Sequence, residues 1–261
     1  MDDVVSALRA AGCVWAEEEA EHLRRAALDL ARRRNDPRAA LVLAELVARR
    51  VAGEPLEHVT GRVRFLGMTL AVAPGVFVPR RRTEQLAELV VERVRPGTVV
   101  VELCCGVAPV AAAVLGAQRE AVVHAVDIDP AALSCAETNL RGGLVHRGDL
   151  FGGLPRLLRR RIDVVVASPP YVPTADIGQL PREAREHERF EALDGGADGL
   201  DLHRRILADA PGWLRPGGEV LLECAAHQAE TLERAFRHHG FSPETAHDEE
   251  RDATVVGGPL L

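Results

Sequence analysis

Residues 98–108 read TVVVELCCGVA, an apolar run that ends in an acidic residue and a turn of small side chains. The valines predict a buried strand over 98–103, and the apolar residues after the turn predict a helix over 107–115. A strand that leads directly into a helix is one unit of a parallel sheet covered by helices. These residues therefore indicate an α/β fold.

The same alternation of strand-like and helical patterns continues toward the C-terminus. Further strands are expected at 121–127, 144–147, 162–167 and 219–224. Further helices are expected at 82–94, 130–139, 202–214 and 227–238. A final antiparallel pair, 244–248 and 253–256, would close the sheet. The predicted fold class is α/β, with a mostly parallel sheet and an antiparallel C-terminal strand.

The chain before this sheet divides into a helical part and a linker. Apolar residues recur at intervals of three and four, which predicts a small N-terminal helical domain over 1–52. Two short β-type runs around Gly67 predict a β-hairpin within a linker over 53–80. The α/β domain then occupies 81–261.

The composition limits the classes of function. A net charge of −7 disfavours a wholly basic nucleic-acid-binding protein, although a local basic patch on an acidic protein is still compatible with it. Five cysteines without a Cys-x-x-Cys spacing indicate neither a disulfide framework nor a zinc site, so no metal is expected. The acidic N-terminus does not resemble a signal peptide, and no apolar run approaches the ~20 residues of a membrane span. We therefore expect a cytoplasmic protein with no membrane partner.

The turn after the first strand predicts a ligand site, because small side chains let a ligand approach the backbone. With the acidic residue before it, this turn supplies Glu102, Cys104, Cys105, Gly106 and Ala108. A dinucleotide-binding fold has the spacing Gly-x-Gly-x-x-Gly here. The turn lacks that spacing, so a phosphate-bearing cofactor is disfavoured. Glu102 would repel a pyrophosphate, but it suits a cationic ligand.

Two later strand ends complete the predicted ligand site. The second strand ends at Asp127, next to Ile128, where such folds bind ribose hydroxyls through a carboxylate. The third strand leads to Asp149 and Leu150, in a loop that could contact an adenine ring. Asp129 is expected to cap the helix that follows it.

The order and spacing of these residues resemble the layout of class I methyltransferases, which bind S-adenosyl-L-methionine in a Rossmann-like fold. In that layout the first acidic residue supports the methionyl end of the cofactor, and the acid of the next strand binds its ribose. The turn there usually reads Glu/Asp-x-Gly-x-Gly-x-Gly, whereas Cys104 and Ala108 replace the first and third glycines here. Both substitutes are small, so we expect a working cofactor site on steric grounds.

The strand at 162–167 runs directly into the loop Ser168-Pro169-Pro170-Tyr171, the predicted catalytic loop. Each proline fixes its own φ and restricts the residue before it, so the Ser168 hydroxyl, the Pro169 carbonyl and the Tyr171 ring are presented in one geometry. Two acceptors on the N–H groups of a planar amide or amino nitrogen would hold it facing a methyl donor. The ring would stack on the planar group. The loop therefore indicates methyl transfer to nitrogen.

Further blocks of sequence accompany this loop. They are Gly53-Glu54-Pro55-Leu56, Pro74-Gly75-Val76-Phe77-Val78-Pro79-Arg80, Ala192-Leu193-Asp194-Gly195-Gly196, Asp198-Gly199-Leu200 and Leu214-Arg215-Pro216-Gly217-Gly218. Together with the loop they resemble the protein-(glutamine-N5) methyltransferases that modify peptide-chain release factors. The resemblance implies a glutamine side chain, from an exposed loop of a protein such as a release factor, as the methyl acceptor. It also implies that the N-terminal helical domain helps to hold that protein.

The catalytic loop departs from the family's usual Asn-Pro-Pro-Tyr at Ser168, whose hydroxyl can still accept a hydrogen bond. A serine in that place also resembles some amino-methylating DNA enzymes. Three hypotheses stay open: a glutamine-N5 methyltransferase acting on a protein, an amino-methyltransferase acting on nucleic acid, and a non-catalytic binding module with a degraded cofactor loop. The linker blocks favour the first, and the acidic net charge weighs against the second. Cys104 and Ala108 are the main support for the third.

Overall fold

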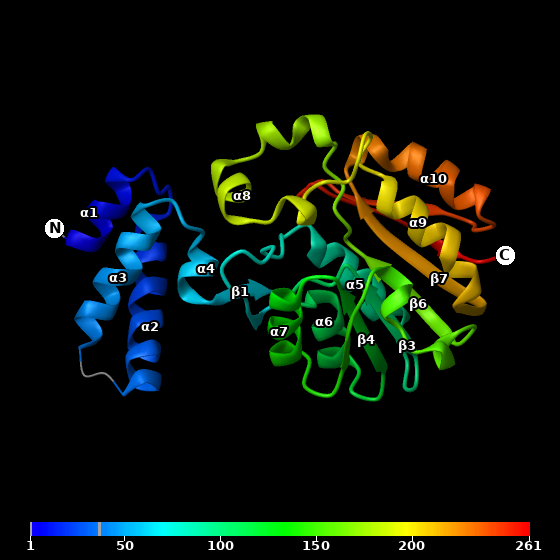
Figure 1. Cartoon of the computed structure of the whole chain (residues 1–261), viewed down its shortest axis with the longest axis horizontal. Helices are drawn as coiled ribbons and strands as arrows, with labels where there is room; N and C mark the ends of the chain where they lie inside the picture. The colour runs from blue at the N-terminus through cyan, green and yellow to red at the C-terminus, as the bar shows by residue number, and fades with distance from the viewer. Residues whose placement is uncertain (1, 36–37) are drawn as a thin grey trace.

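The computed structural model describes residues 2–35 and 38–261. Helices pack together at the N-terminal end of the molecule (Figure 1). They are α1 Asp3–Ala10, α2 Ala16–Arg34, α3 Ala39–Val51 and α4 Leu56–Thr60. Their apolar faces form a cluster of their own, which includes Leu8, Leu23 and Leu46. The helical pattern of the first residues is thus matched by a small helical core.

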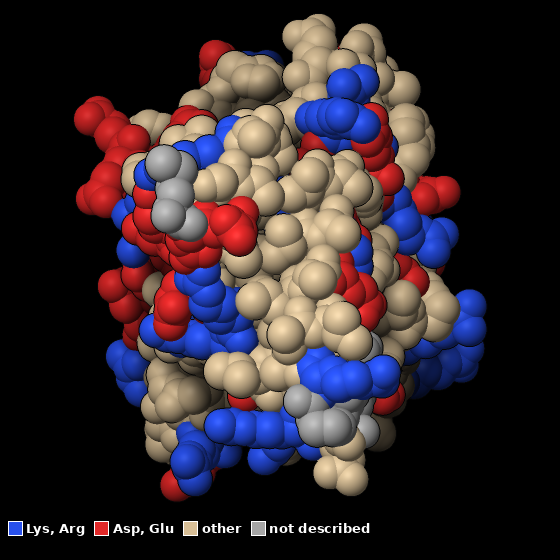
Figure 2. Space-filling model, turned by 90° about the vertical axis from the view of Figure 1, so that its left-hand side faces the viewer, with Lys and Arg blue, Asp and Glu red and all other residues tan. Residues whose placement is uncertain are grey.

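The outer surface of these helices carries charged side chains and apolar ones. Figure 2, which views this end of the molecule, shows arginine and acidic side chains around a band of uncharged residues. Exposed large hydrophobic residues in this part of the chain are Val14, Trp15, Leu28, Leu41 and Val51. This end of the molecule therefore presents apolar side chains to solvent.

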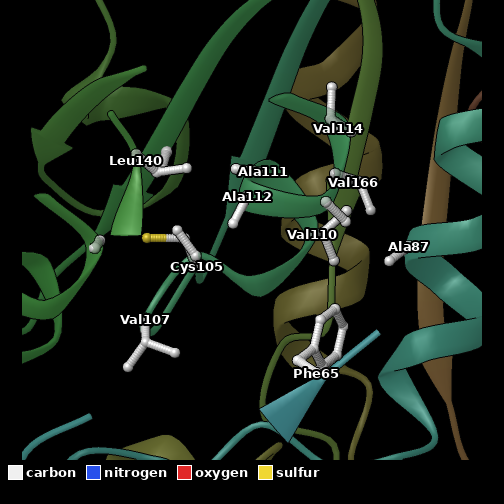
Figure 3. Close-up of a cluster of buried hydrophobic side chains, with 14 of the residues drawn as sticks. Phe65, Ala87, Cys105, Val107, Val110, Ala111, Ala112, Val114, Leu140 and Val166 are labelled. Atoms are coloured by element: carbon white, nitrogen blue, oxygen red, sulfur yellow. The ribbon is translucent and has the colours of Figure 1, made fainter. Parts of the chain in front are cut away.

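A β-hairpin connects the helices to the α/β part. Its strands, β1 Arg62–Phe65 and β2 Met68–Ala71, pair antiparallel. Phe65 is buried in the same hydrophobic cluster as Val110 and Val166, so the hairpin packs against the α/β part (Figure 3). The hairpin predicted from the sequence is present.

In the described part of the chain, a seven-stranded sheet forms the centre of the α/β fold (Figure 1). In spatial order its strands are β5 Leu144–Arg147, β4 Val122–Asp127, β3 Val99–Leu103, β6 Ile162–Ala167, β7 Leu214–Cys224, β9 Ala253–Pro259 and β8 Glu244–Asp248. Strands β3 to β7 pair in parallel, and β9 runs antiparallel to both of its neighbours. The predicted fold class is confirmed.

Helices cover both faces of this sheet, as the valine-rich strands require. One face carries α5 Thr83–Arg93, α6 Pro109–Ala117 and α7 Pro130–Asn139. The other face carries α9 Asp201–Asp209 and α10 Ala229–His238. The chain passes from β3 to β4 on one side and returns to β6 on the other, so the strand order reverses at β3. Ligands of such folds bind outside the carboxyl ends of the strands at this reversal.

Two predicted elements differ from the observed ones. The helix expected over 202–214 ends at Asp209, because Pro211 lacks an N–H group and its ring blocks a further helical turn. Strand β7 begins at Leu214, earlier than expected, and its pairing with β6 is irregular around Gly217, which has a φ of 71°. The turn-forming residues predicted before this strand are thus a distorted part of the strand itself.

Short helices that the sequence pattern did not predict lie between β6 and α9. One of them is the α-helix α8 Arg182–His187. Turns of 3₁₀ helix occur at Leu150–Gly153, Arg156–Leu158, Thr174–Gln179, Phe190–Ala192, Ala210–Gly212 and Ala226–Gln228. Across residues 2–35 and 38–261, no helix combines the length and apolar character needed to span a membrane.

Candidate functional site

A cavity of about 610 Å³ opens at the carboxyl ends of β3, β4 and β6. All but one of the site residues predicted from the sequence line it: Glu102, Cys104, Cys105, Gly106, Asp127, Ile128, Asp149, Leu150, Ser168, Pro169, Pro170 and Tyr171. The exception is Ala108, which is fully buried at the N-cap of α6. The fold thus brings the predicted ligand site and the predicted catalytic loop to one cavity.

The turn after β3 holds alternate residues in the left-handed region. The φ angles are 50° at Cys104, 53° at Gly106 and 61° at Ala108. A residue with a Cβ is less stable in this region by about 1–2 kcal/mol, whereas glycine adopts it readily. Glycines are therefore favoured at these positions by backbone conformation as well as by steric room. Cys104 and Ala108 keep the conformation of the turn at an energetic cost.

Glu102 links β3 to the helix that follows it. Its buried carboxylate accepts hydrogen bonds from the backbone N–H groups of Val110 (3.3 Å) and Ala111 (2.7 Å) in α6. Burial raises the pKa of Glu102 to about 8, and the two N–H donors oppose that shift. The carboxyl group anchors the N-terminus of α6 beside the cavity.

Asp127 links the end of β4 to the turn after β3. Its Oδ2 accepts from the Gly106 N–H (2.8 Å), and its Oδ1 accepts from the Asp129 N–H (2.9 Å). Burial raises the pKa of Asp127, and these N–H donors lower it. Each carboxylate oxygen retains a lone pair, so the group can still bind hydroxyls of a ligand. Asp129 accepts from the Ala131 N–H (2.9 Å), which confirms its predicted role as the cap of α7.

The wall beyond Asp127 combines apolar and acidic groups. Ile128 is 55% exposed, although its side chain is apolar, and it lines the cavity. Leu150 is buried with a φ of 48°, and Asp149 accepts a hydrogen bond from Arg205 of α9 at 2.6 Å. An exposed isoleucine near a carboxylate suits a flat heterocycle that carries an amino group.

The predicted catalytic loop is held in place by the segment that precedes α9. The Val172 N–H donates to the carbonyl of Leu193 (3.2 Å), and the Gly195 N–H donates to the carbonyl of Val172 (2.9 Å). The Thr174 hydroxyl donates to Asp194 at 2.6 Å. The glycine-rich block that the sequence analysis set beside the loop therefore packs directly against it.

Gln228, in the turn before α10, fixes the same loop from another side. Its Nε2 donates to the carbonyls of Tyr171 and Asp198, each at 2.9 Å. A Cβ at Gly199 would lie 2.2 Å from the Tyr171 carbonyl oxygen, closer than any real contact allows. Only glycine at position 199 allows this close approach. Gln228 was not predicted from the sequence, since a lone polar residue before a helix carries no distinctive pattern.

Glu223, near the carboxyl end of β7, is a second residue that the sequence analysis missed. It is 1% exposed, and its Oε1 accepts a hydrogen bond from the Tyr171 hydroxyl at 3.0 Å. Burial raises the pKa of Glu223, while the neighbouring hydroxyls of Thr83 and Tyr171 and the charge of Arg82 lower it. The available signal was an acidic residue at a strand end, the same signal that identified Glu102 and Asp127.

The mouth of the cavity is formed by the segment around α8. Glu188, whose side chain is buried, accepts from the Val78 N–H (3.2 Å) and from the Arg80 guanidinium (2.6 Å to each oxygen). Glu183 of α8 accepts from Arg50 of α3 at 2.6 Å. The linker and the N-terminal helices thus both contact this wall. Among the residues that the structure describes, no group of three or more potential metal ligands occurs.

The comparisons with known proteins agree with this geometry. Residues 67–182 match the methyltransferase small domain family. The release factor glutamine methyltransferase of Geobacter sulfurreducens is 38% identical over 220 residues, 82% of this chain and 76% of that protein. The enzyme of the same name from Mycolicibacterium smegmatis is 36% identical and covers 95% of this chain and 92% of its own length.

One further relative is named for a different acceptor, and a solved structure shares the fold. The 4-amino-L-phenylalanine/4-methylamino-L-phenylalanine methyltransferase of Streptomyces pristinaespiralis is 34% identical over 74% of this chain and 69% of its own length. Among solved structures, a T. thermophilus 16S rRNA methyltransferase, determined with AdoMet and guanosine, has a TM-score of 0.54 at 21% identity. It covers 77% of this chain and 50% of its own, and its likeness shows the shared fold.

Proposed function

The chain belongs to the release factor glutamine methyltransferase family, and we propose that it methylates the side-chain amide nitrogen (N5) of a glutamine in a peptide-chain release factor. The observation that carries the proposal is the position of Ser168 and Tyr171. They face the same cavity as the acidic strand ends of a methyltransferase fold. The activity would take place in the cytoplasm, where translation terminates.

S-adenosyl-L-methionine is the methyl donor of this enzyme family, and when bound it supplies an electrophilic methyl group. The cavity fits such a cationic nucleoside, because its floor carries buried carboxyl groups and lacks a glycine-rich phosphate turn. Asp127 would bind the ribose hydroxyls, and Ile128 and Leu150 would contact the adenine ring. Asp149 would accept from the adenine amino group. The turn from Glu102 to Ala108 would surround the methionyl end.

The catalytic loop would hold the acceptor nitrogen. An amide nitrogen is a poor nucleophile because its lone pair is delocalised into the carbonyl. Acceptor groups on both N–H bonds, the Ser168 hydroxyl and the Pro169 carbonyl, would orient this nitrogen and stabilise positive charge that develops on it. The Tyr171 ring would stack on the flat amide. The α8 wall would exclude water from the reacting groups.

The position of this site suggests a separate role for each of the three parts of the chain. We assign substrate recognition to the N-terminal helical domain, residues 1–52, and the connecting role to the linker, residues 53–80. Methyl transfer belongs to residues 81–261. The contact of Arg50 with Glu183 supports the assignment, because it joins a helix of the first domain to the mouth of the cavity.

A second candidate acceptor is a small aromatic amine. It is favoured by the relative from Streptomyces pristinaespiralis, whose name gives 4-amino-L-phenylalanine as its substrate. An aniline nitrogen, like an amide nitrogen, is planar and carries two N–H groups, so the same loop contacts would serve. A nucleic-acid base is less favoured, because the net charge is −7 and the relatives described above at more than 30% identity are named for protein and amino-acid acceptors.

The test is transfer of labelled methyl from S-adenosyl-L-methionine to purified release factor, to 4-amino-L-phenylalanine and to RNA, with mass spectrometry to locate the label. We expect label on one glutamine of the release factor. Ser168→Ala and Tyr171→Ala should lower kcat by about 100-fold and keep cofactor binding by calorimetry. Label on the amine alone would replace the first candidate with the second. An inactive protein that does not bind the cofactor would support the binding-module hypothesis.

A further inference from the structure

Glu223 and Ser168 lie side by side at the carboxyl edge of the sheet. Ala167 at the end of β6 is paired with Leu222 of β7 in parallel register, so the next residues of the two strands are neighbours. In a parallel pair, residues in register project to the same face of the sheet. Ser168 belongs to the catalytic loop, whereas Glu223 has no role in the function proposed above.

The Glu223 carboxylate has one oxygen occupied and one without a partner. Oε1 accepts from the Tyr171 hydroxyl at 3.0 Å. Oε2 is buried and has no hydrogen bond within the described residues. A buried acceptor left unsatisfied costs about 1–3 kcal/mol, so its retention calls for a reason. The Ser168 hydroxyl is close enough to lower the pKa of this carboxyl group.

We propose that Glu223 is a positioning residue whose Oε2 accepts a hydrogen bond from the Ser168 hydroxyl. The Ser168 oxygen can then only accept a hydrogen bond from the acceptor nitrogen. The inference rests on the proposed function of the loop. It also explains how serine can stand where the family has asparagine. An asparagine side chain has a separate donor and acceptor, whereas a serine hydroxyl must be oriented by a neighbour.

The same contact provides a path for the proton that leaves the nitrogen. As the nitrogen–methyl bond forms and the sulfur–methyl bond breaks, the nitrogen becomes acidic. Its proton passes to the Ser168 Oγ while the hydroxyl proton passes to Glu223 Oε2. The carboxylate ends neutral, the serine is unchanged, and the positive charge of the sulfonium is cancelled. Glu223 must therefore be ionised before the reaction.

Other groups around Glu223 would not replace it in this role. Arg82 and the Tyr171 hydroxyl face it from the segments before α5 and after β6, and Thr83 adds a hydroxyl from α5. Cys224 follows it on β7, and burial raises the pKa of that thiol to about 12. His203 of α9 binds the Glu223 carbonyl at 2.8 Å, and burial lowers the pKa of its ring to about 4. Glu223 is the carboxyl group of this cluster, and burial raises its pKa.

The test compares Glu223→Gln, Glu223→Asp and a control, Glu219→Gln, which alters the Arg93 pair elsewhere on β7. We expect Glu223→Gln to lower kcat by about 100-fold, with the affinity for S-adenosyl-L-methionine changed less than twofold. Wild-type kcat should rise with pH as Glu223 ionises, and this rise should disappear in Glu223→Gln. Glu223→Asp should keep part of the wild-type kcat and part of its rise with pH. Glu219→Gln should behave as wild type.

A double-mutant cycle with Ser168→Ala separates this inference from the proposed function. If Glu223 acts through Ser168, the double variant Ser168→Ala/Glu223→Gln should be no slower than Ser168→Ala alone. Multiplicative losses, or an unchanged pH profile in Glu223→Gln, would overturn the inference and leave the function intact. Full activity of Ser168→Ala would overturn the function itself. If Glu223→Gln fails to fold, the pH profile of kcat for Glu223→Asp provides the test, because this variant keeps a carboxyl group but retracts it from Ser168. A reduced pH-dependent rise supports the inference, and a profile equal to wild type overturns it.

Discussion

At the scale of single residues, Cys104 and Ala108 show that glycine is favoured in the turn after β3 for its backbone freedom. Both residues have positive φ values, 50° and 61°, where a Cβ is unfavourable. The sequence alone indicates only that both replacements are small. The small size of both side chains explains why the turn can form. The positive φ angles explain why a residue with a Cβ is less stable there than glycine.

Replacement of Ala108 by glycine should therefore stabilise the protein. The gain from the left-handed conformation exceeds the added entropy of the unfolded chain, and we expect an increase of about 0.5–1 kcal/mol in the free energy of unfolding. Urea denaturation measures it. Ala113→Gly, in the interior of α6, is the matched control and should destabilise by about 1 kcal/mol or more. Equal losses in the two variants would show that the φ of Ala108 is not strained.

Position 168 offers a second prediction at the residue scale. Ser168→Asn restores the loop of the related enzymes, and its amide can donate to Glu223 Oε2 while its oxygen accepts from the substrate nitrogen. We expect this variant to keep kcat on a release factor within about tenfold, because both contacts survive. Ser168→Val, of similar bulk without a polar group, should lose the activity. Steady-state kinetics on the same substrate compares the two, and an inactive Ser168→Asn would mean that the site is adapted to serine.

At the scale of elements, Glu102 connects β3 to α6, and its raised pKa makes this connection sensitive to pH. A carboxyl group whose pKa is about 8 in the folded state and 4.5 in the unfolded state binds protons more tightly when folded. Its contribution to stability is fully present below pH 4.5 and is lost as the pH rises toward 8. We expect Glu102→Gln to remove this loss. The stability of the variant relative to wild type should increase between pH 5 and 8, by on the order of 1 kcal/mol per pH unit.

Thermal or urea unfolding at several pH values tests this expectation. Glu120→Gln, in the exposed turn before β4, is the control and should leave the pH dependence of wild type intact. If Glu102→Gln follows the same pH curve as wild type, then Glu102 ionises normally in the folded protein.

The contact between the catalytic loop and the segment before α9 predicts a sharp effect at Gly199. An alanine there combines a φ of 79° with a Cβ 2.2 Å from the Tyr171 carbonyl oxygen, so the loop must move. We expect Gly199→Ala to lower kcat by at least about 100-fold, because a shift of about 1 Å misplaces the acceptor. Gly178→Ala, in the 3₁₀ turn Thr174–Gln179, meets no atom within 4 Å and should keep full activity.

The helices and strands also show which parts of the structure could be predicted from sequence patterns. The strands and the position of the loop 168–171 at the cavity were predictable, because buried valine runs and a loop with Pro169 and Pro170 have few alternative structures. Helix α8 was not, since six residues are too few for a periodic apolar pattern. Glu223 was overlooked because its importance depends on pairing between strands that lie far apart in the sequence. Contacts across β6 and β7 become visible once the register is known.

At the scale of the whole molecule, the N-terminal helices present apolar side chains away from the cavity. Trp15 and Leu41 are 66% and 59% exposed, and Figure 2 shows an uncharged band on this end of the protein. Exposed apolar side chains bordered by charges are typical of surfaces that bind another protein. The ion pair between Arg50 and Glu183 connects these helices to the mouth of the cavity.

If these helices hold the release factor, Trp15→Ser and Leu41→Ser should raise KM for that protein while leaving kcat unchanged, because they remove binding that is equal in the ground and transition states. Loss of a buried interface aromatic residue typically costs about 2 kcal/mol, so we expect a KM increase of about 30-fold for Trp15→Ser.

A short glutamine-containing peptide, which cannot reach the helices, should be methylated at the same rate by both variants and by wild type. Leu157→Ser, at an exposed residue of the α/β part, is the matched control. An unchanged KM for the release factor in both variants would assign its recognition to the α/β domain, and equal losses on the peptide would point to a folding defect.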